Sequence, residues 1–184
     1  MKTTRFYSML AAIALAYAPA AHAEGPSFAT VNIQKIMQES SAAKSVREQI
    51  DGKMKALQSE LSKKDEQFQK EHQEIEKQRS ALSKQAFEEK TRSFSTKVTS
   101  AQKEVQSKKV MLDNAFERAI SDIQKAVTEI IAGMAKEKNV TVVLPTSQIL
   151  YADEKLDITS EVLTKLNQKL AKVDVKFEAA AEKK

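Results

Sequence analysis

The fold is decided by the stretch KMKALQSELSKKDEQFQKEHQEIEKQRSALS, residues 53–83. It begins a longer segment, residues 53–132, that contains neither glycine nor proline and is rich in Lys, Glu, Gln, Ala and Ser. Apolar residues recur here every seven positions, which keeps one stripe of a helix apolar: Met54, Leu61, Phe68, Ile75 and Leu82. The companion heptad position is apolar at Ile50 and Leu57 and polar further on, at Lys64, Glu71 and Gln78. The stretch therefore predicts the outgoing helix of a long antiparallel hairpin.

We expect this helix to begin near Ala42, with Ser40-Ser41 as its cap, and to run to about Ser80. At 1.5 Å per residue it would reach roughly 60 Å, whereas a compact domain of this size has a radius of gyration of only about 15 Å. The helix must therefore protrude. We place the turn at residues 79–83, with Ser83 as the cap of a returning helix over about residues 84–138, whose outer half carries a thin apolar stripe: Phe87, Phe94, Val98 and Val105.

A compact body is expected where the returning helix becomes apolar over a wide arc, from Val110 onward. Around it we predict strands at residues 28–33, 140–144 and 149–152, with a short helical turn at Ile36-Met37. Gly133 and Asn139 should loosen the helix end. A closing helix is predicted from Asp157 to about Lys172 with Thr159 as its N-cap; residues 173–177 would add a strand or pack outside, and residues 178–184 form a solvated tail.

The predicted fold class is mainly α, with a helical-hairpin arm over residues 51–110 projecting from a small β-sheet or barrel-like body. That body is discontinuous, residues 24–50 and 111–177. Short strands leave sheet edges exposed, so strands from several copies would cover one another, which predicts an oligomer but no subunit number. We expect the body core to comprise Val31, Ile33, Phe116, Ile120, Ile123, Val127, Ile130, Val140, Val142 and Leu144.

The N-terminal 23 residues have the pattern of a cleavable signal peptide. Lys2 and Arg5 precede a short apolar run, and Ala21-His22-Ala23 supplies the small-x-small cleavage pattern before Glu24. Loss of this leader removes two basic residues and lowers the formal net charge from +5 to +3. We therefore expect an exported protein.

Basic residues gather on the arm. Residues 53–109 contain 14 basic and 9 acidic side chains, so the arm is positive and the rest of the exported chain slightly negative. Such an arm could attract acidic clients or an anionic lipid or lipopolysaccharide surface, although a solvated coiled-coil face explains the same charges. Nucleic acid is disfavoured by export and by the lack of interleaved aromatic residues. The candidate anionic contacts are Lys77, Arg79, Lys84, Lys90, Arg92 and Lys97.

The sequence offers little for catalysis. There is no cysteine, and the exported chain has a single histidine, His72, on the charged helix, where a solvated residue is a simpler interpretation than a metal ligand. Glycines are too few for a phosphate-binding loop, and no base is positioned for a catalytic triad. We predict no enzymatic activity, no cofactor and no metal.

Four features belong together: the leader; VNIQKIM at residues 31–37 with Ser40 after it; the strand 140–144 leading to Ile149-Leu150-Tyr151; and Asp157-Ile158-Thr159 with Val162-Leu163 behind it. In these features the chain resembles the Skp/OmpH family of periplasmic chaperones. The Asp-Ile-Thr start of the closing helix is the most specific of them. Residues 173–177 extend past the end that the resemblance leads us to expect.

The resemblance implies a homotrimer whose β-barrel-like body is built from all three subunits and carries three hairpin arms around a cavity. It also implies ATP-independent holding of unfolded outer-membrane proteins. Such clients expose alternating apolar residues and aggregate through them, and thin apolar stripes flanked by Lys and Arg stems would offer many weak contacts. The candidate client contacts are Met54, Phe68, Phe87, Phe94 and Val98, with the seam between the arm's two helices as the alternative place for each.

A second hypothesis is a structural or tethering coiled coil that spans a fixed distance between two components of the cell envelope. A spacer needs a continuous apolar seam, whereas this seam turns polar at positions 64, 71 and 78. The polar positions therefore favour splayed, flexible arms and the holding function.

Overall fold

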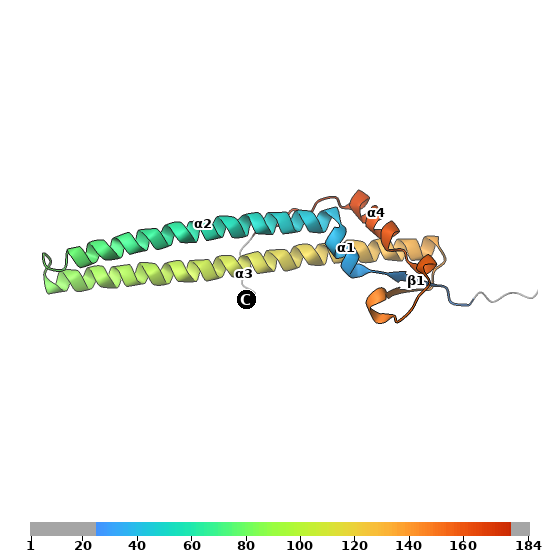
Figure 1. Ribbon diagram of the computed structural model, residues 1–184, viewed down its shortest axis with the longest axis horizontal. Coiled ribbons are helices and arrows are strands. Elements are labelled where there is room, and N and C mark those ends of the chain that lie inside the picture. The colour runs from blue at the N-terminus through green and yellow to red at the C-terminus, as the bar shows by residue number, and fades with distance from the viewer. Residues whose placement is uncertain (1–24, 178–184) are drawn as a thin grey trace, which may run out of the picture.

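The chain folds into a long helical hairpin attached to a small body. The computed structural model describes residues 25–177 of the 184-residue chain; the predicted signal peptide and the tail at residues 178–184 lie outside the described residues. Two long helices, α2 and α3, run antiparallel and extend far beyond the cluster formed by β1, α1, β2 and α4 (Figure 1). This arrangement confirms the predicted fold class.

The arm has the bounds that its caps predict. Helix α2 spans Ser41–Lys77, and the hydroxyl of Ser40 accepts a hydrogen bond from the backbone N–H of Ala43. Helix α3 spans Lys84–Glu137, and the Ser83 hydroxyl caps it in the same way. Each helix ends within about three residues of the predicted position. At 1.5 Å per residue, α2 is roughly 55 Å long and α3 roughly 80 Å.

The end of α3 differs from the prediction. Gly133 lies inside the helix, which continues to Glu137, so this glycine does not loosen it. Asn139 adopts the left-handed conformation, with φ of 54°, and the Val140 N–H donates back to the Ala135 carbonyl at 2.8 Å. This is the Schellman arrangement, in which asparagine substitutes for the usual glycine. The stop signal is therefore Asn139 alone.

The sheet of the body has two parallel strands. Strand β1, Phe28–Val31, pairs with β2, Val142–Pro145, in the register Phe28 to Val142. On its other side β1 meets the start of the closing helix, where Ile158 N–H donates to the Thr30 carbonyl at 2.9 Å. A two-stranded sheet is marginal by itself, so its stability depends on the helices packed against it.

The predicted strand at residues 149–152 is wrong. A short 3-10 turn, η1 (Thr146–Gln148), follows β2 and directs the chain outward. The next residues form no strand, and the side chains of Leu150 and Tyr151 are 108% and 87% exposed. The physical reason is that η1 separates these residues from β2, so they do not pair with its free edge, and β1 is already bordered on both sides, by β2 and by the backbone at residues 157–158.

The closing helix α4 spans Thr159–Lys169, after a 3-10 turn η2 at Glu154–Leu156. It is shorter than predicted, and Thr159 is its first residue rather than its N-cap. The Asp157 carboxylate accepts hydrogen bonds from both the N–H and the hydroxyl of Thr159, while the Thr159 hydroxyl accepts from Asn32 N–H at 2.8 Å. Asn32 in turn caps helix α1, Ile33–Glu39.

The core lies where α1 and α4 meet the first turns of α2 and the last turns of α3. Of the predicted core residues, Val31, Ile123, Val127 and Ile130 are buried, and Ile33, Ile120 and Val140 pack against them. Val142 is half-buried. Phe116 and Leu144 are 38% and 37% exposed, so they do not belong to the core of a single chain.

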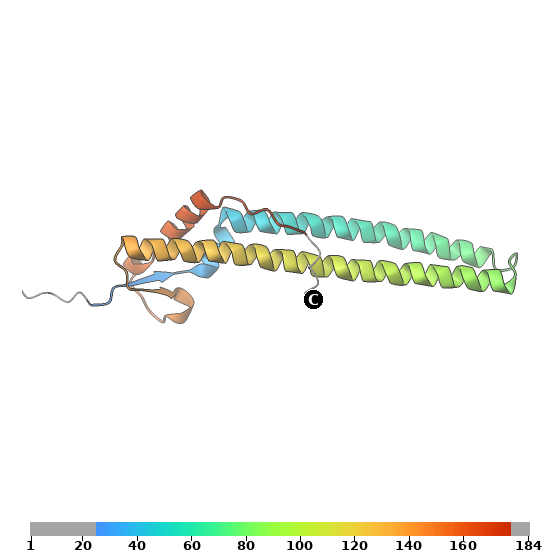
Figure 2. The ribbon, with the colours of Figure 1, turned by 180° about the vertical axis from the view of Figure 1, so that it is seen from behind.

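Residues 173–177 form no strand. They run in an extended conformation along α2 away from the body, as the view from behind shows (Figure 2). Val175 is buried there, with only 7% of its side chain exposed. Of the two predicted alternatives, the structure shows outside packing.

Candidate functional site

The two helices of the arm are joined by polar pairs in one fixed register. Three of these pairs involve the polar heptad positions of α2: Lys64 Nζ lies 2.7 Å from Glu104 Oε2, Glu71 Oε1 lies 2.5 Å from Lys97 Nζ, and Gln78 Oε1 lies 2.5 Å from Lys90 Nζ. Each pair is symmetric about residue 84, the first residue of α3. The register therefore does not slip between the middle of the arm and its tip.

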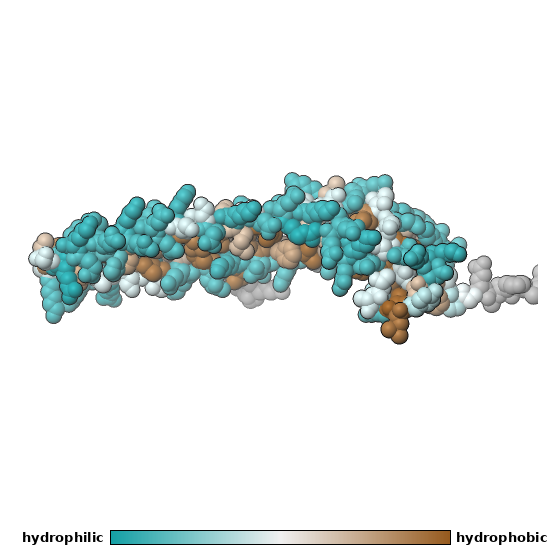
Figure 3. All heavy atoms as spheres, in the orientation of Figure 1, coloured by the Kyte–Doolittle hydropathy of each residue, from teal (hydrophilic) through white to brown (hydrophobic). Residues whose placement is uncertain are grey.

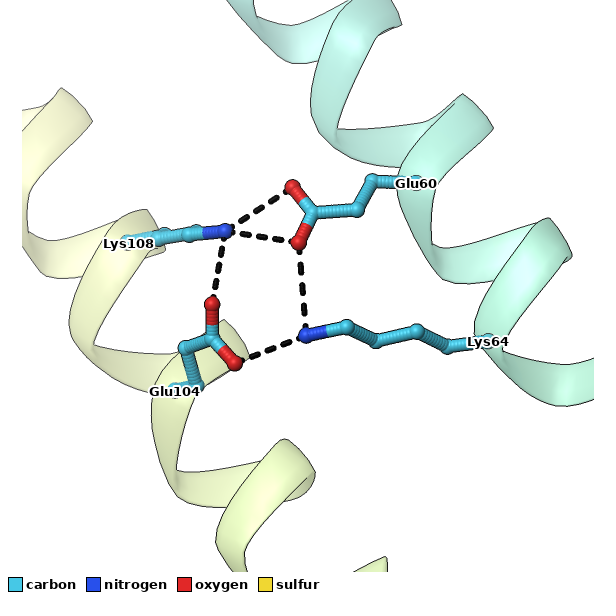
Figure 4. Close-up of polar contacts among 4 residues, drawn as sticks. All are labelled: Glu60, Lys64, Glu104 and Lys108. Carbon is cyan, nitrogen blue, oxygen red and sulfur yellow. Dashed lines mark hydrogen bonds and ion pairs between the residues drawn. The ribbon is translucent and has the colours of Figure 1, made fainter. Parts of the chain in front are cut away.

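Near the middle of the arm, four charged side chains close a ring (Figure 4). Lys108 Nζ lies 2.8 Å from carboxylate oxygens of both Glu60 and Glu104, and Lys64 Nζ bridges the same two carboxylates at 3.3 and 2.7 Å. Glu60 and Lys64 come from α2, and Glu104 and Lys108 from α3. Two of these contacts, Lys64–Glu104 and Lys108–Glu60, join the two helices, and the other two lie within a single helix at i,i+4 spacing.

Each charged group in the ring shifts the pKa values of its neighbours. Hydrogen bonds from Lys108 and then Lys64 lower the pKa of Glu104 to about 2 and also lower the pKa of Glu60. The carboxylate of Glu104 is the main cause that raises the pKa values of both lysines. All four groups are therefore held in their charged forms around neutral pH.

The polar heptad positions do not separate the two helices of the hairpin, and the expectation of splayed, flexible arms stays a prediction. Polar heptad positions would separate two helices only if their side chains lacked partners, and here they have partners on the opposite helix. The sequence contained the signal, because the two partners of each pair lie equally far before and after residue 84. A reading of α2 alone could not reveal it.

Aromatic and apolar side chains fill the seam between the polar pairs. The rings of Phe68 and Phe94 meet edge to face with centroids 6.0 Å apart, and the His72 ring lies 5.7 Å from Phe94. Nearby is a cavity of about 210 Å³, lined in part by Leu61, Phe68, Val98 and Val105. The structure thus places Phe68, Phe94 and Val98 along the seam between the helices.

The other two candidate client contacts lie apart from that cluster. Phe87 sits beside the turn, half-buried, with the guanidinium of Arg79 5.5 Å from its ring centroid. Met54 lies near the body end of the arm and is 43% exposed. The structure does not bring the five candidates together on one surface, and their role in binding stays a prediction.

The basic residues of the outer arm have partners of their own. Lys77, Arg79 and Lys84 lie within 4.0 Å of Glu74, Glu76 and Glu88, respectively. Lys90 and Lys97 bridge to α2 as described above, and Arg92 lines a shallow surface pocket next to Phe87. The positive charge of the outer arm is therefore partly compensated locally.

The body presents apolar side chains to solvent around its sheet. The largest exposures are those of Leu150 and Tyr151 in the loop after η1, and Phe28, Leu144 and Leu156 are more than a third exposed. The loop after β2 appears as a hydrophobic projection on the surface (Figure 3). These side chains form an exposed apolar face beside the sheet.

Within residues 25–177, no group of three or more histidine and acidic side chains could hold a metal ion. None of the helices in the same range combines the length and the hydropathy that a membrane-spanning helix requires.

Comparison with known proteins gives the family. The family model for outer membrane protein (OmpH-like) matches residues 27–166, about three quarters of the chain. The chain belongs to the OmpH-like family. The matched region contains the arm and nearly all of the body and stops before residues 173–177.

Among solved structures, the fold is similar to that of a candidate outer membrane chaperone (OmpH-like) from Caulobacter crescentus CB15. The TM-score is 0.78 at 14% sequence identity, and the match covers 86% of this chain and 94% of that chain. At this identity the match shows a shared fold. No curated protein sequence matches the chain.

Proposed function

We propose that this OmpH-like protein is an ATP-independent periplasmic chaperone that holds unfolded outer-membrane β-barrel proteins between the arms of a homotrimer. The free-standing arm carries this proposal: α2 and α3 extend far from the body, with most of their outer surface open to solvent (Figure 3). A single catalytic pocket would need no such arm. Support for the client class comes from the family and from the relative described as an outer membrane chaperone.

The surface of the arm suits weak, repeated contacts. Met54, Val110 and Phe116 are each more than a third exposed near its base, among long Lys and Arg side chains. Apolar stems with charged ends can cover the apolar segments of a client without a shaped pocket. Contacts of this kind keep a client soluble and still release it.

The proposed homotrimer is supported by the exposed face of the body. The two-stranded sheet is too small to be stable alone, and Leu150 and Tyr151 extend beside it into solvent. Burial of large apolar side chains against other copies would stabilise both the sheet and the assembly. The subunits would then direct their arms to the same side of the body and enclose a client.

A tether is the second candidate function, and one observation favours it. The constant register of the polar pairs makes the arm a continuous two-helix rod rather than a loosely paired one. A rod of this kind could also span a fixed distance between two envelope components. Binding of anionic lipid at the arm tip is compatible with either function, through the exposed lysines there.

The test is the molar mass of the exported form by light scattering, before and after dilution of an unfolded outer-membrane β-barrel protein into it. The chaperone proposal requires a trimer that gains the mass of one client and keeps it in solution. A trimer that leaves the client to precipitate would point to the tether instead.

A salt series tests the electrostatic part of the proposal. The positive arm should attract acidic client segments, and salt screens charges over about 10 Å at 0.1 M. Client capture should therefore slow as the salt concentration rises. On-rates that stay unchanged from low to high salt would remove electrostatic attraction from the mechanism.

A further inference from the structure

The C-terminal strap, residues 173–177, is bound along the base of the arm in the manner of an extended peptide. Its sequence is Val-Asp-Val-Lys-Phe, and its side chains alternate: Val175 is buried, Val173 and Phe177 are half-buried against the core, and the two charged residues between them are exposed. This two-residue period is that of a β-strand with one apolar face. The strap lies beyond the residues that the family model matches.

One side chain of α2 holds the backbone of the strap. The amide of Gln49 donates from Nε2 to the Val173 carbonyl at 2.7 Å and accepts at Oε1 from the Val175 N–H at 3.1 Å. A carbonyl at position i and an N–H at position i+2 are the groups that a neighbouring strand would bind. Gln49 therefore recognises extended backbone and no particular sequence.

The groove offers more apolar surface than the strap covers. Phe177 borders a cavity of about 340 Å³, whose apolar lining includes Leu57, Met111 and Leu112. Lys53 Nζ lies 5.2 Å from the centroid of the Phe177 ring, a favourable cation–π position. The cavity has room for a further apolar side chain next to the aromatic one.

We propose that this groove is a binding subsite for an extended client segment with apolar residues at alternate positions, and that the strap occupies it in the free protein as an intramolecular competitor. The inference rests on the proposed function and adds to it a site and a regulatory contact. Alternation of apolar and polar residues is the signature of strands in membrane β-barrels. The strap has that pattern, and Gln49 would accept any backbone that carries it.

The test is the binding of a fluorescently labelled peptide that copies residues 172–177, followed by anisotropy. It compares the full exported chain, the same chain with Val175→Asp, and a chain ending at Lys172. Val175→Asp releases the strap by placing a charge at a buried position, and it leaves the chain length intact. Circular dichroism establishes that each variant keeps its helices.

Release of the strap should increase peptide affinity at least about tenfold, because a tethered segment competes at an effective concentration in the millimolar range. Adding Gln49→Ala to either released variant should abolish that gain. Gln58→Ala, at an exposed position of the same helix, is the matched control and should leave the gain unchanged.

Two results would overturn the inference: equal affinity of all three forms for the peptide, or equal binding of a peptide with the same composition and contiguous apolar residues. Client holding, measured in parallel, separates the two proposals. If the full chain holds a β-barrel client and strap release changes neither peptide nor client binding, only the subsite is wrong. If no form holds a client while the peptide binds through Gln49, the holding function is wrong.

Discussion

Thr159 shows how a single hydroxyl joins the first strand of the body to its last helix. Thr159 is 2% exposed; its hydroxyl accepts a hydrogen bond from the N–H of Asn32, 127 residues earlier in the chain, and donates one to the Asp157 carboxylate. The Asp-Ile-Thr segment is thus a connection within the body, in addition to the start of a helix. The hydrogen bonds among Asn32, Asp157 and Thr159 form only when residue 32 and residues 157–159 lie side by side.

Replacement of Thr159 by valine should test this connection, because valine keeps the shape and removes the hydroxyl. Asn32 N–H would then lose its acceptor in a part-buried position, which costs about 1–3 kcal/mol of the free energy of unfolding. Urea denaturation measures the loss. Thr164→Val is the control, since that exposed hydroxyl donates only within α4 and its loss should cost less than about 0.5 kcal/mol. Equal losses for both variants would contradict the connection.

Glu104 gives the arm a pH dependence. Its pKa is about 2 in the folded chain against an ordinary value of 4.5, so its contribution to stability is fully present above pH 4.5 and is lost as the pH falls toward 2. The raised pKa values of Lys64 and Lys108 act at the other limit, where stability declines as the pH rises above 10.5. The ring therefore stabilises the hairpin between these limits.

Glu104→Gln should lower the melting temperature at neutral pH, and the difference from the unchanged protein should disappear as the pH approaches 2. Thermal melts followed by circular dichroism between pH 2 and pH 7 measure it. The matched control is Glu66→Gln, at an exposed position of α2, which should not show this convergence. A difference that stays constant over the whole range would show that the ring does not titrate as described.

At the level of the elements, the arm is one antiparallel pair with a defined register. The apolar heptads predicted its two helices, and the serines predicted where each begins. The register was not predicted, because it depends on which residues of two helices face each other across a turn. The pairs Lys64–Glu104 and Glu71–Lys97 establish it only when the position of the turn is known.

The same limit explains the errors in the body. The strand predicted at residues 149–152 has suitable β-forming residues, yet a strand must pair with an edge; β1 is bordered on both sides, and the turn η1 separates these residues from the free edge of β2. The N-cap assigned to Thr159 failed because its hydroxyl is used by Asn32, which is far away in the sequence. Local sequence patterns predicted most of the helices and strands, whereas contacts between distant segments decided which residues pair in the sheet and which residue precedes α4.

The aromatic pair in the seam provides a test of the register. Edge-to-face pairs such as Phe68 and Phe94 couple by about 0.5–1.5 kcal/mol beyond the area they bury. A double-mutant cycle with Phe68→Leu and Phe94→Leu should give a coupling energy in that range. The cycle of Phe68→Leu with Phe87→Leu is the control and should be additive, because Phe87 lies at the turn beside Arg79. Additivity of both cycles would place Phe68 and Phe94 apart in solution.

At the scale of the whole molecule, the arm and the body differ in how far a single chain buries their apolar side chains. The arm is stabilised by contacts between its own two helices, whereas the body leaves Leu150 and Tyr151 in solvent beside a two-stranded sheet. A monomer would expose this face permanently. The proposed self-association would cover it and would also bring several arms together for the proposed holding function.

Leu150→Ser combined with Tyr151→Ser, in the chain without the predicted leader, should therefore lower the molar mass from that of the proposed trimer toward that of one chain. Both side chains are solvent-exposed in the single chain, so the change removes no core contact and the helices should remain. Light scattering after gel filtration measures the mass, and circular dichroism the helix content. Met54→Ser is the matched control, an exposed apolar residue on the arm whose loss should leave the mass unchanged. If the double variant had the molar mass of one chain and still held a β-barrel client, one arm would suffice for holding and the enclosed cavity would be unnecessary. If it kept the molar mass of the trimer, the subunits must meet through another surface, and Leu150 and Tyr151 would themselves become candidates for client contact.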